Sequence, residues 1–272
     1  MPETSIICGA YNAASCFTFK KSVESILNGD YRDFELIICD DGSTDTTWEQ
    51  LSEYAEADSR IRLIRNEKNI GLAASLNRCL SEARGEFVAR HDLDDYSAPD
   101  RLTKQIAFLK ENPDVSVLGC AAKLFDEQGV FGEERFPERV ERRDFLFTSP
   151  FKHGSVVFRK DALLHAGGYR VSAETYRTED YDLFMRMKLF CEMANLNEAL
   201  YYFLEDEKAL RRRKYKYRID EAKVRYRGFR ELGLLPGGIF YVIKPLIVGL
   251  IPNFLLKKLR KRRRNKKNEK SC

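Results

Sequence analysis

Over residues 4–90, short apolar runs alternate with amphipathic stretches, and this alternation constrains the fold more than any other feature. Four of the runs predict buried strands, at residues 4–8, 34–39, 60–64 and 86–90. Apolar residues at helical spacing predict a helix in each interval between them. Strands that are apolar throughout and alternate with helices are typical of a parallel sheet covered on both faces. The sequence therefore predicts an α/β fold, doubly wound around a mainly parallel central sheet.

The chain beyond residue 95 gives shorter and less regular signals. Helices are predicted at residues 100–111 and 160–166 and after Thr178-Glu179-Asp180, and strands at residues 115–118 and 154–158. Residues 126–150 are charged and have no periodic pattern, so we expect irregular structure there.

Three polar clusters directly follow predicted strands: Tyr11-Asn12, Asp40-Asp41, and His91-Asp92-Leu93-Asp94-Asp95. Ligands of doubly wound sheets bind beyond the carboxyl ends of the strands, so we expect these clusters to meet at one edge. Side chains alternate along an extended chain, so Asp92 and Asp94 are predicted to point the same way. Their oxygens would suit Mg²⁺ or Mn²⁺. The alternative is a solvated acidic turn.

Other polar clusters also have a structural alternative. One of Asp40 and Asp41 could cap the following helix, while the other accepts a hydrogen bond from a ligand such as a nucleobase N–H. Thr178-Glu179-Asp180 could be no more than a favourable acidic start of a helix. His153, which lies in Lys152-His153-Gly154-Ser155, is a candidate for a cleft residue.

In this order, the clusters resemble the family 2 glycosyltransferases of the GT-A fold, in particular those of bacterial O-antigen and capsule biosynthesis. The resemblance covers about residues 4–200. The matching segments are Ala10-Tyr11-Asn12, Asp40-Asp41-Gly42-Ser43-Thr44-Asp45, Asn69-Ile70-Gly71 with Asn77, Ala89-Arg90-His91-Asp92-Leu93-Asp94-Asp95, His153-Gly154-Ser155 and Thr178-Glu179-Asp180-Tyr181-Asp182-Leu183. One Asp-x-Asp is a weak signal, whereas this ordered series is a strong one.

The resemblance implies a nucleotide-sugar donor, usually a UDP-sugar, and a role for each matching residue. The implied donor-binding residues are Ala10, Tyr11, Asn12, Asp41, Asn69, Arg90 and Asp92. Tyr11 would stack near the uracil, and Asp41 would accept a hydrogen bond from its N3–H. Asp94, together with Asp92, would bind the divalent cation that bridges the diphosphate, either Mn²⁺ or Mg²⁺.

The chemistry that the resemblance implies needs one proton acceptor at the reacting centre. Asp180 would be this general base, with Glu179 beside it, while the metal neutralises the leaving UDP. Leu76 stands where many members of the family carry an arginine. Arg78 or Arg90 could serve instead as the contact with the donor.

The net charge of +5 conceals two regions of opposite charge. Residues 211–272 hold 21 of the 47 Lys and Arg residues but only 4 of the 42 Asp and Glu residues, a net charge of +17 that leaves −12 for residues 1–210. We therefore expect a GT-A catalytic domain over residues 1–210 and a basic helical extension over residues 211–272. A basic extension of this kind meets an anionic partner.

A membrane surface is the anionic partner that the extension favours. Residues 239–256 are apolar but are interrupted by Lys244 and two prolines, so we expect them to lie in the membrane interface rather than span it. Residues 257–270 then carry ten Lys and Arg residues and one Glu. An apolar segment next to a polybasic one anchors a protein on anionic lipid. We expect a cytoplasmic protein, peripheral on the inner face of the cell membrane.

Taken together, these signals predict an inverting, metal-dependent enzyme that transfers a hexose from a UDP-sugar to a saccharide acceptor. By the resemblance, the acceptor would be linked to undecaprenyl diphosphate in surface polysaccharide biosynthesis, and the transfer a β-1,3-glucosyl or β-1,3-galactosyl transfer. Two alternatives stay open: a nucleic-acid-binding protein that uses residues 211–270, and a catalytically idle scaffold of the same fold. We expect no nucleic-acid partner.

Overall fold

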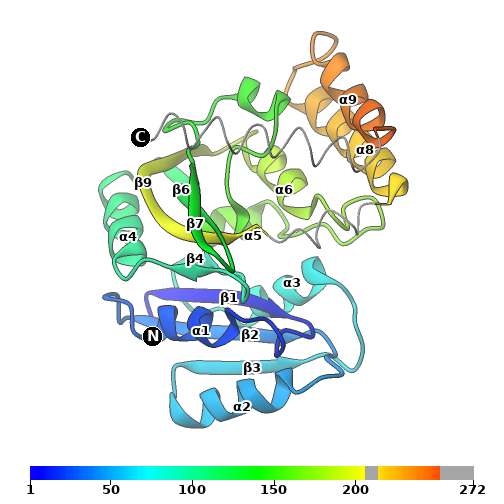
Figure 1. The fold of residues 1–272 in the computed structure, drawn as a ribbon. Helices are drawn as coiled ribbons and strands as arrows, with labels where there is room; N and C mark the ends of the chain where they lie inside the picture. The colour runs from blue at the N-terminus through cyan, green and yellow to red at the C-terminus, as the bar shows by residue number, and fades with distance from the viewer. Residues whose placement is uncertain (206–213, 252–272) are drawn as a thin grey trace.

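The computed structural model describes residues 1–205 and 214–251, and its strands form one curled sheet (Figure 1). The predicted parallel core is confirmed. Its strands are β1 (Thr4–Ala10), β2 (Phe34–Asp40), β3 (Ile61–Arg65) and β4 (Phe87–Arg90). They run parallel in the order β3-β2-β1-β4, so their carboxyl ends lie at one edge of the sheet.

The rest of the sheet is mixed. Its strands are β5 (Tyr96–Ser97), β6 (Val115–Asp126), β7 (Gly129–Glu134), β8 (Val157–Arg159) and β9 (Glu192–Leu204). From β4 the order continues β8-β6-β9-β5, with β7 paired to β6. Only β6 and β9 pair in parallel here, and register shifts between them accompany the curl. The long strand β9 has no counterpart among the sequence predictions.

Two expectations for the middle of the chain are wrong. The strand expected at residues 115–118 is only the start of β6, and β7 lies within residues 126–150, which were expected to be irregular. The two strands form a hairpin with a turn at residues 127–128, directly followed by Gly129, where φ is +116°. Because β7 is half-exposed and polar, its sequence lacks the apolar signal of a buried strand.

Helices cover both faces of the sheet. One face carries α1 (Phe19–Leu27), α2 (Thr47–Ala57) and α4 (Arg101–Glu111), and the other carries α3 (Leu72–Glu82), α5 (Lys160–His165), α6 (Glu179–Met187) and α8 (Tyr215–Glu231). In β1, the side chains of Ile6 and Cys8 are buried under the helices of the first face, and that of Ile7 is buried under the helices of the second face. A strand covered on both faces must be apolar at successive positions, which explains the continuous runs.

The C-terminal helices pack onto the second face of the sheet. Helix α8 lies against α6, where a Cβ at Gly228 would meet the Met185 side chain, and α9 (Ile239–Gly249) lies alongside α8 (Figure 1). Val224 and Phe229 of α8 are fully buried in the same core as Ile7 of β1. The boundary expected at residue 210 falls outside the described residues and stays a prediction.

The apolar segment expected at residues 239–256 is described only up to residue 251. Within the described ranges, no helix is long and apolar enough to cross a bilayer. The polybasic run at residues 257–270 lies outside the described residues.

Candidate active site

Asp92 and Asp94 lie on a tight turn rather than on an extended segment, so the geometric basis of their pairing was wrong. The Asp95 N–H donates to the Asp92 carbonyl at 3.1 Å, which closes the turn. Leu93 and Asp95 are buried, and the Asp95 carboxylate accepts from the Leu204 N–H at 2.7 Å. Burying these two side chains in the short segment forces the turn, which leaves Asp92 half-buried and Asp94 exposed.

Arg90 is held directly against Asp92. Its guanidinium is fully buried and donates to Asp92 Oδ1 at 2.5 Å, and also to the carbonyls of Ile7 and His91. Burial opposes the charge of Arg90, but the charges around it, first that of the Asp92 carboxylate, together outweigh burial and raise the pKa of Arg90. Arg90 therefore stays charged beside Asp92.

His153-Gly154-Ser155 form a 3-10 turn, η2, that packs on Asp92, so the strand expected at residues 154–158 begins only at Val157. A Cβ at Gly154 would lie 2.7 Å from Asp92 Oδ2, so only glycine fits this approach. His153 Nε2 lies 2.9 Å from the Tyr169 hydroxyl. Burial and the charge of Arg90 lower the pKa of His153 to about 3, so the ring is neutral at physiological pH.

Glu179 and Asp180 begin α6, and their charges interact with that of Asp92. The pKa of Glu179 is raised to about 8, most by burial, then by the neighbouring Asp180, and with a smaller contribution from Asp92. Burial also raises the pKa of Asp180, again with a contribution from Asp92. Segments nearly ninety residues apart in sequence therefore share one electrostatic field.

The first turn of α6 is anchored from three directions by Asp182. Its carboxylate is buried and accepts from Arg170 at 2.9 Å, from Arg186 at 2.8 Å and from Arg227 of α8 at 3.0 Å. Three guanidiniums on one carboxylate fix the orientation of the helix start. Asp180 is thereby held in place two residues earlier.

Asp41 organises the loop that follows β3. One carboxylate oxygen accepts from Asn66 Nδ2 and from the Ile70 N–H, both at 2.8 Å, and the other accepts from the Gly71 N–H at 2.9 Å. Gly71 needs its glycine because φ is +94°. The second oxygen keeps acceptor capacity for a ligand N–H. Asn69, in the same loop, is exposed.

The loop after β1 is tied to the loop after β2. The Asn12 N–H donates to Ser43 Oγ at 3.0 Å, and Asn12 Oδ1 accepts from the Thr44 N–H at 2.9 Å. Asn12 adopts φ +49°, a left-handed conformation that asparagine tolerates. Tyr11, which precedes it, is 51% exposed, and Ala10 is buried.

Helix α3 contains Leu76, where many members of the family carry an arginine, and Arg78, which could serve instead. Leu76 is fully buried, while Arg78 is exposed and donates to the Arg65 carbonyl at 3.1 Å and to the Asn66 side chain. Neighbouring Asn77 donates to the Tyr169 carbonyl at 2.7 Å.

Residues that sequence analysis missed support the site from behind. Arg101 is buried and donates to the Gly154 carbonyl at 2.9 Å, and the Tyr201 hydroxyl accepts from the Asp92 N–H at 3.2 Å. Tyr169 lies in the field of Asp92, Glu179 and Asp180: burial raises its pKa most, and their charges raise it further. No local pattern marks any of these, because their partners are distant in sequence.

The donor set of Asp92 and Asp94 fits a divalent cation that ligands complete from outside. Within residues 1–205 and 214–251, no group of three or more His, Cys, Asp or Glu side chains forms a metal cage. Mg²⁺ and similar ions are commonly held by one or two carboxylates plus substrate phosphates and water. A half-buried and an exposed carboxylate on one turn suit this arrangement.

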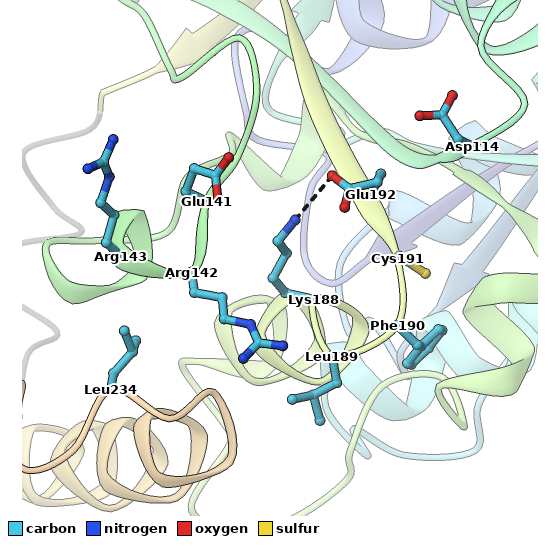
Figure 2. Close-up of a pocket in the computed structure, with 10 residues that line it drawn as sticks. All are labelled: Asp114, Glu141, Arg142, Arg143, Lys188, Leu189, Phe190, Cys191, Glu192 and Leu234. Carbon is cyan, nitrogen blue, oxygen red and sulfur yellow. Dashed lines mark hydrogen bonds and ion pairs between the residues drawn. The ribbon is translucent and has the colours of Figure 1, made fainter.

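A hollow of about 870 Å³ elsewhere on the surface is a different feature (Figure 2). It lies between the 3-10 turn η1 (Arg142–Leu146), the end of α6 and the start of β9. Figure 2 shows acidic and basic side chains interspersed around it, with Lys188 paired to Glu192 at 3.4 Å. The hollow is lined by none of the residues that we expect to bind the donor or the metal or to act as the general base.

Comparison with known proteins identifies relatives of this arrangement. The family model described as "Glycosyl transferase family 2" matches residues 5–167. EpsE of Bacillus subtilis (strain 168), named as a glycosyltransferase, is 42% identical over 267 residues, which cover 96% of this chain and 94% of EpsE. An Escherichia coli UDP-Gal:alpha-D-GlcNAc-diphosphoundecaprenol beta-1,3-galactosyltransferase is 28% identical over 84% of each chain.

Among solved structures, the fold is similar to that of S. aureus TarS 1-349 in complex with UDP-GlcNAc. The TM-score is 0.69 and the sequence identity 22%, over 91% of this chain and 71% of TarS. The likeness confirms the predicted GT-A fold.

Proposed function

The chain belongs to glycosyl transferase family 2, and from this premise we propose that it transfers a hexose from a UDP-sugar to a lipid-linked saccharide with inversion at the anomeric carbon. The observation that carries the proposal is the convergence of the Asp92–Asp94 turn with the start of α6 at Glu179 and Asp180. A donor diphosphate and a proton acceptor need to meet in this way.

In the proposed reaction, Asp180 accepts the proton of the acceptor hydroxyl as that oxygen attacks the anomeric carbon. Burial raises the pKa of Asp180, which makes its carboxylate a stronger base than an exposed aspartate. Glu179, whose pKa is about 8, stays protonated near neutral pH and adds no negative charge beside it. His153 stays neutral and offers a hydrogen bond rather than a charge.

Asp94, with Asp92, would hold the divalent cation, either Mn²⁺ or Mg²⁺. When bound, such a cation neutralises the charge that develops on the leaving diphosphate. Arg90 orients Asp92 for this role through the 2.5 Å contact. Because the Arg90 side chain is fully buried and pairs with Asp92, its contribution to donor binding would be indirect.

The loops after β1, β2 and β3 would bind the nucleoside. The exposed Tyr11 ring offers a surface on which uracil can stack, and Asp41 keeps an oxygen for the N3–H. Ala10, Asn12 and Asn69 would shape the same pocket.

The acceptor that we propose is a saccharide on undecaprenyl diphosphate, in the biosynthesis of a bacterial surface polysaccharide. The Escherichia coli relative is named for transfer to such an acceptor, GlcNAc-diphosphoundecaprenol. A β-1,3-glucosyl or β-1,3-galactosyl transfer is the specific activity that we propose.

A lipid-linked acceptor would require the enzyme to work at a membrane surface. The exposed face of α9 supports this location. Helix α9, with the residue after it, carries five large apolar side chains that are 43–72% exposed: Ile239, Phe240, Ile243, Ile247 and Leu250. Their spacing puts them on one broad face of the helix. A contiguous exposed apolar surface of this kind is typical of a site that contacts a membrane or a partner. With the basic residues 257–270, this face would dock the protein on the anionic cytoplasmic side of the membrane.

The proposal is tested by screening UDP-sugars with Mn²⁺ or Mg²⁺ and an alkyl-diphospho-GlcNAc acceptor, with products read by mass spectrometry. We expect metal-dependent transfer from one or a few donors. Asp94→Ala should lose metal-dependent UDP binding, whereas the exposed, distant Asp114→Ala should keep it. Unchanged UDP affinity in Asp94→Ala would exclude the metal role.

A further inference from the structure

A groove of about 390 Å³ opens beside Asp180 and runs along α8. Its walls are the first turn of α6, the segment at Thr148 and Ser149, and α8. The charged side chains that line it are Arg177, Lys214, Arg218 and Arg225, against Asp180 and Glu221. The groove therefore carries twice as many basic groups as carboxylates.

The carboxylates of the groove leave positive charge uncompensated. Glu221 is shared between Arg218, at 2.8 Å, and the buried Arg225, at 3.1 Å. Among the described residues, no carboxylate lies within ion-pair distance of Arg177 or Lys214, and both side chains are exposed. A concave surface with excess positive charge concentrates anions.

Arg177 is positioned by aromatic rings at the junction of α6 and α8. Its guanidinium lies 5.4 Å from the Tyr176 ring centre and 5.7 Å from that of Tyr217, and the two rings stack at 5.9 Å. Contacts with ring faces hold the guanidinium without consuming its N–H donors. A guanidinium held in this way is suited to bind phosphate oxygens in pairs.

The far end of the groove meets the apolar face of α9. A Cβ at Gly249 would lie 2.9 Å from Arg218 Cγ and 3.0 Å from the Tyr215 ring, so this end of α9 packs on the groove residue Arg218 and on Tyr215 beside it. Leu250, the next residue, is 72% exposed. From Asp180 outward, the surface therefore presents a proton acceptor, then cations, then an apolar face.

We propose that this groove binds the phosphate groups of the acceptor, with the saccharide toward Asp180 and the lipid chain toward α9. A glycosyl diphosphate lipid has the same order of parts: hydroxyl groups, then anionic phosphates, then hydrocarbon. The inference rests on the proposed function. The donor diphosphate is the other source of phosphate, and its proposed site is the Asp92–Asp94 turn.

The test compares decyl-diphospho-GlcNAc with decyl GlcNAc, which has the same sugar and chain but no phosphate. Arg177→Gln and Lys214→Gln should each lower kcat/KM for the diphosphate acceptor by roughly tenfold, the loss of one charge-assisted hydrogen bond. The KM for the UDP-sugar and the activity with decyl GlcNAc should stay unchanged. Arg230→Gln, an exposed arginine on the same helix but outside the groove, is the control.

Three results would overturn the inference: equal losses of kcat/KM with both acceptors, a raised KM for the donor, or no loss in the Arg177→Gln/Lys214→Gln double variant.

Calorimetric binding of decyl-diphospho-GlcNAc in the presence of UDP gives a readout that needs no turnover. If the wild type transfers no sugar but binds this probe through Arg177 and Lys214, the proposed function fails and the groove assignment holds. If it transfers sugar with no dependence on these residues, the groove assignment fails alone.

Discussion

The two carboxylate clusters of the site are kept in different electrostatic states. Asp92 lies 2.5 Å from the buried guanidinium of Arg90, which pairs with its carboxylate. Glu179 and Asp180 have no basic side chain within ion-pair distance among the described residues, and burial raises both pKa values. The carboxylates thus differ in their surroundings: the ion pair holds Asp92 in a fixed orientation, and desolvation suits Asp180 to accept a proton.

Exchanging the proton acceptor should have the largest effect. Asp180→Asn keeps the shape of the side chain but removes its basicity, so kcat should fall by about 10²- to 10⁴-fold. UDP affinity should stay within twofold, because the Asp92–Asp94 turn is untouched. Steady-state transfer and equilibrium UDP binding check this. Full turnover in Asp180→Asn would assign the base elsewhere.

Removing the Arg90 guanidinium should lower the stability of the fold as well as the rate of transfer. Arg90→Gln leaves the Asp92 carboxylate without its buried partner, at a cost of about 3 kcal/mol in unfolding free energy. Urea denaturation measures this loss. The exposed Arg78→Gln is the control and should cost less than about 1 kcal/mol. Equal losses of unfolding free energy in the two variants would exclude a stabilising role of the buried Arg90–Asp92 pair.

Glu179→Gln should act in the opposite direction and stabilise the protein. Because the folded pKa of about 8 lies above the value of 4.5 for an exposed glutamate, the folded state binds more protons between these pH values. Stability of the wild type should therefore fall as pH rises through this window, and Glu179→Gln should remove that slope. We expect a gain of roughly 1–3 kcal/mol at pH 8. A parallel pH dependence in both proteins would contradict the raised pKa.

Lys152→Met should give the smallest effect. Burial raises the pKa of Asp180 most, and the charge of Lys152 pulls it partly back. Without Lys152, the acidic limb of the kcat/KM profile should move to higher pH, because Asp180 would be protonated sooner. Glu134→Gln, which removes only the partner of Lys152 at 2.8 Å, is the control and should leave that limb nearly in place. An unmoved limb in Lys152→Met would exclude this coupling.

The comparison between the two halves of the sheet shows what could be predicted. The strands β1 to β4 were predicted within two residues, because a strand buried on both faces is apolar at successive positions. In the mixed half, β7 was taken for irregular chain, since it is a half-exposed hairpin strand with polar residues. Strand β9, which pairs with β6 over an irregular register, was not anticipated.

Site residues were predicted where a motif encodes them and missed where only packing does. The clusters at Asp41, Asp92–Asp94 and Glu179–Asp180 could be found because each follows a strand or begins a helix. Arg101 and Tyr201 could not, because they support Asp92 through contacts with chain segments far away in sequence.

The sequence alone determined the parallel core, the family and the identity of the acidic residues at the carboxyl edge of the sheet. Local patterns carry this information because burial, helix periodicity and turn chemistry act over a few residues. Only the tertiary structure decided that Asp92 lies on a turn against Arg90, that Glu179 and Asp180 share its field, and that α8 lines a basic groove beside them. Those properties depend on distances between remote segments, and charge and desolvation act through space rather than along the chain.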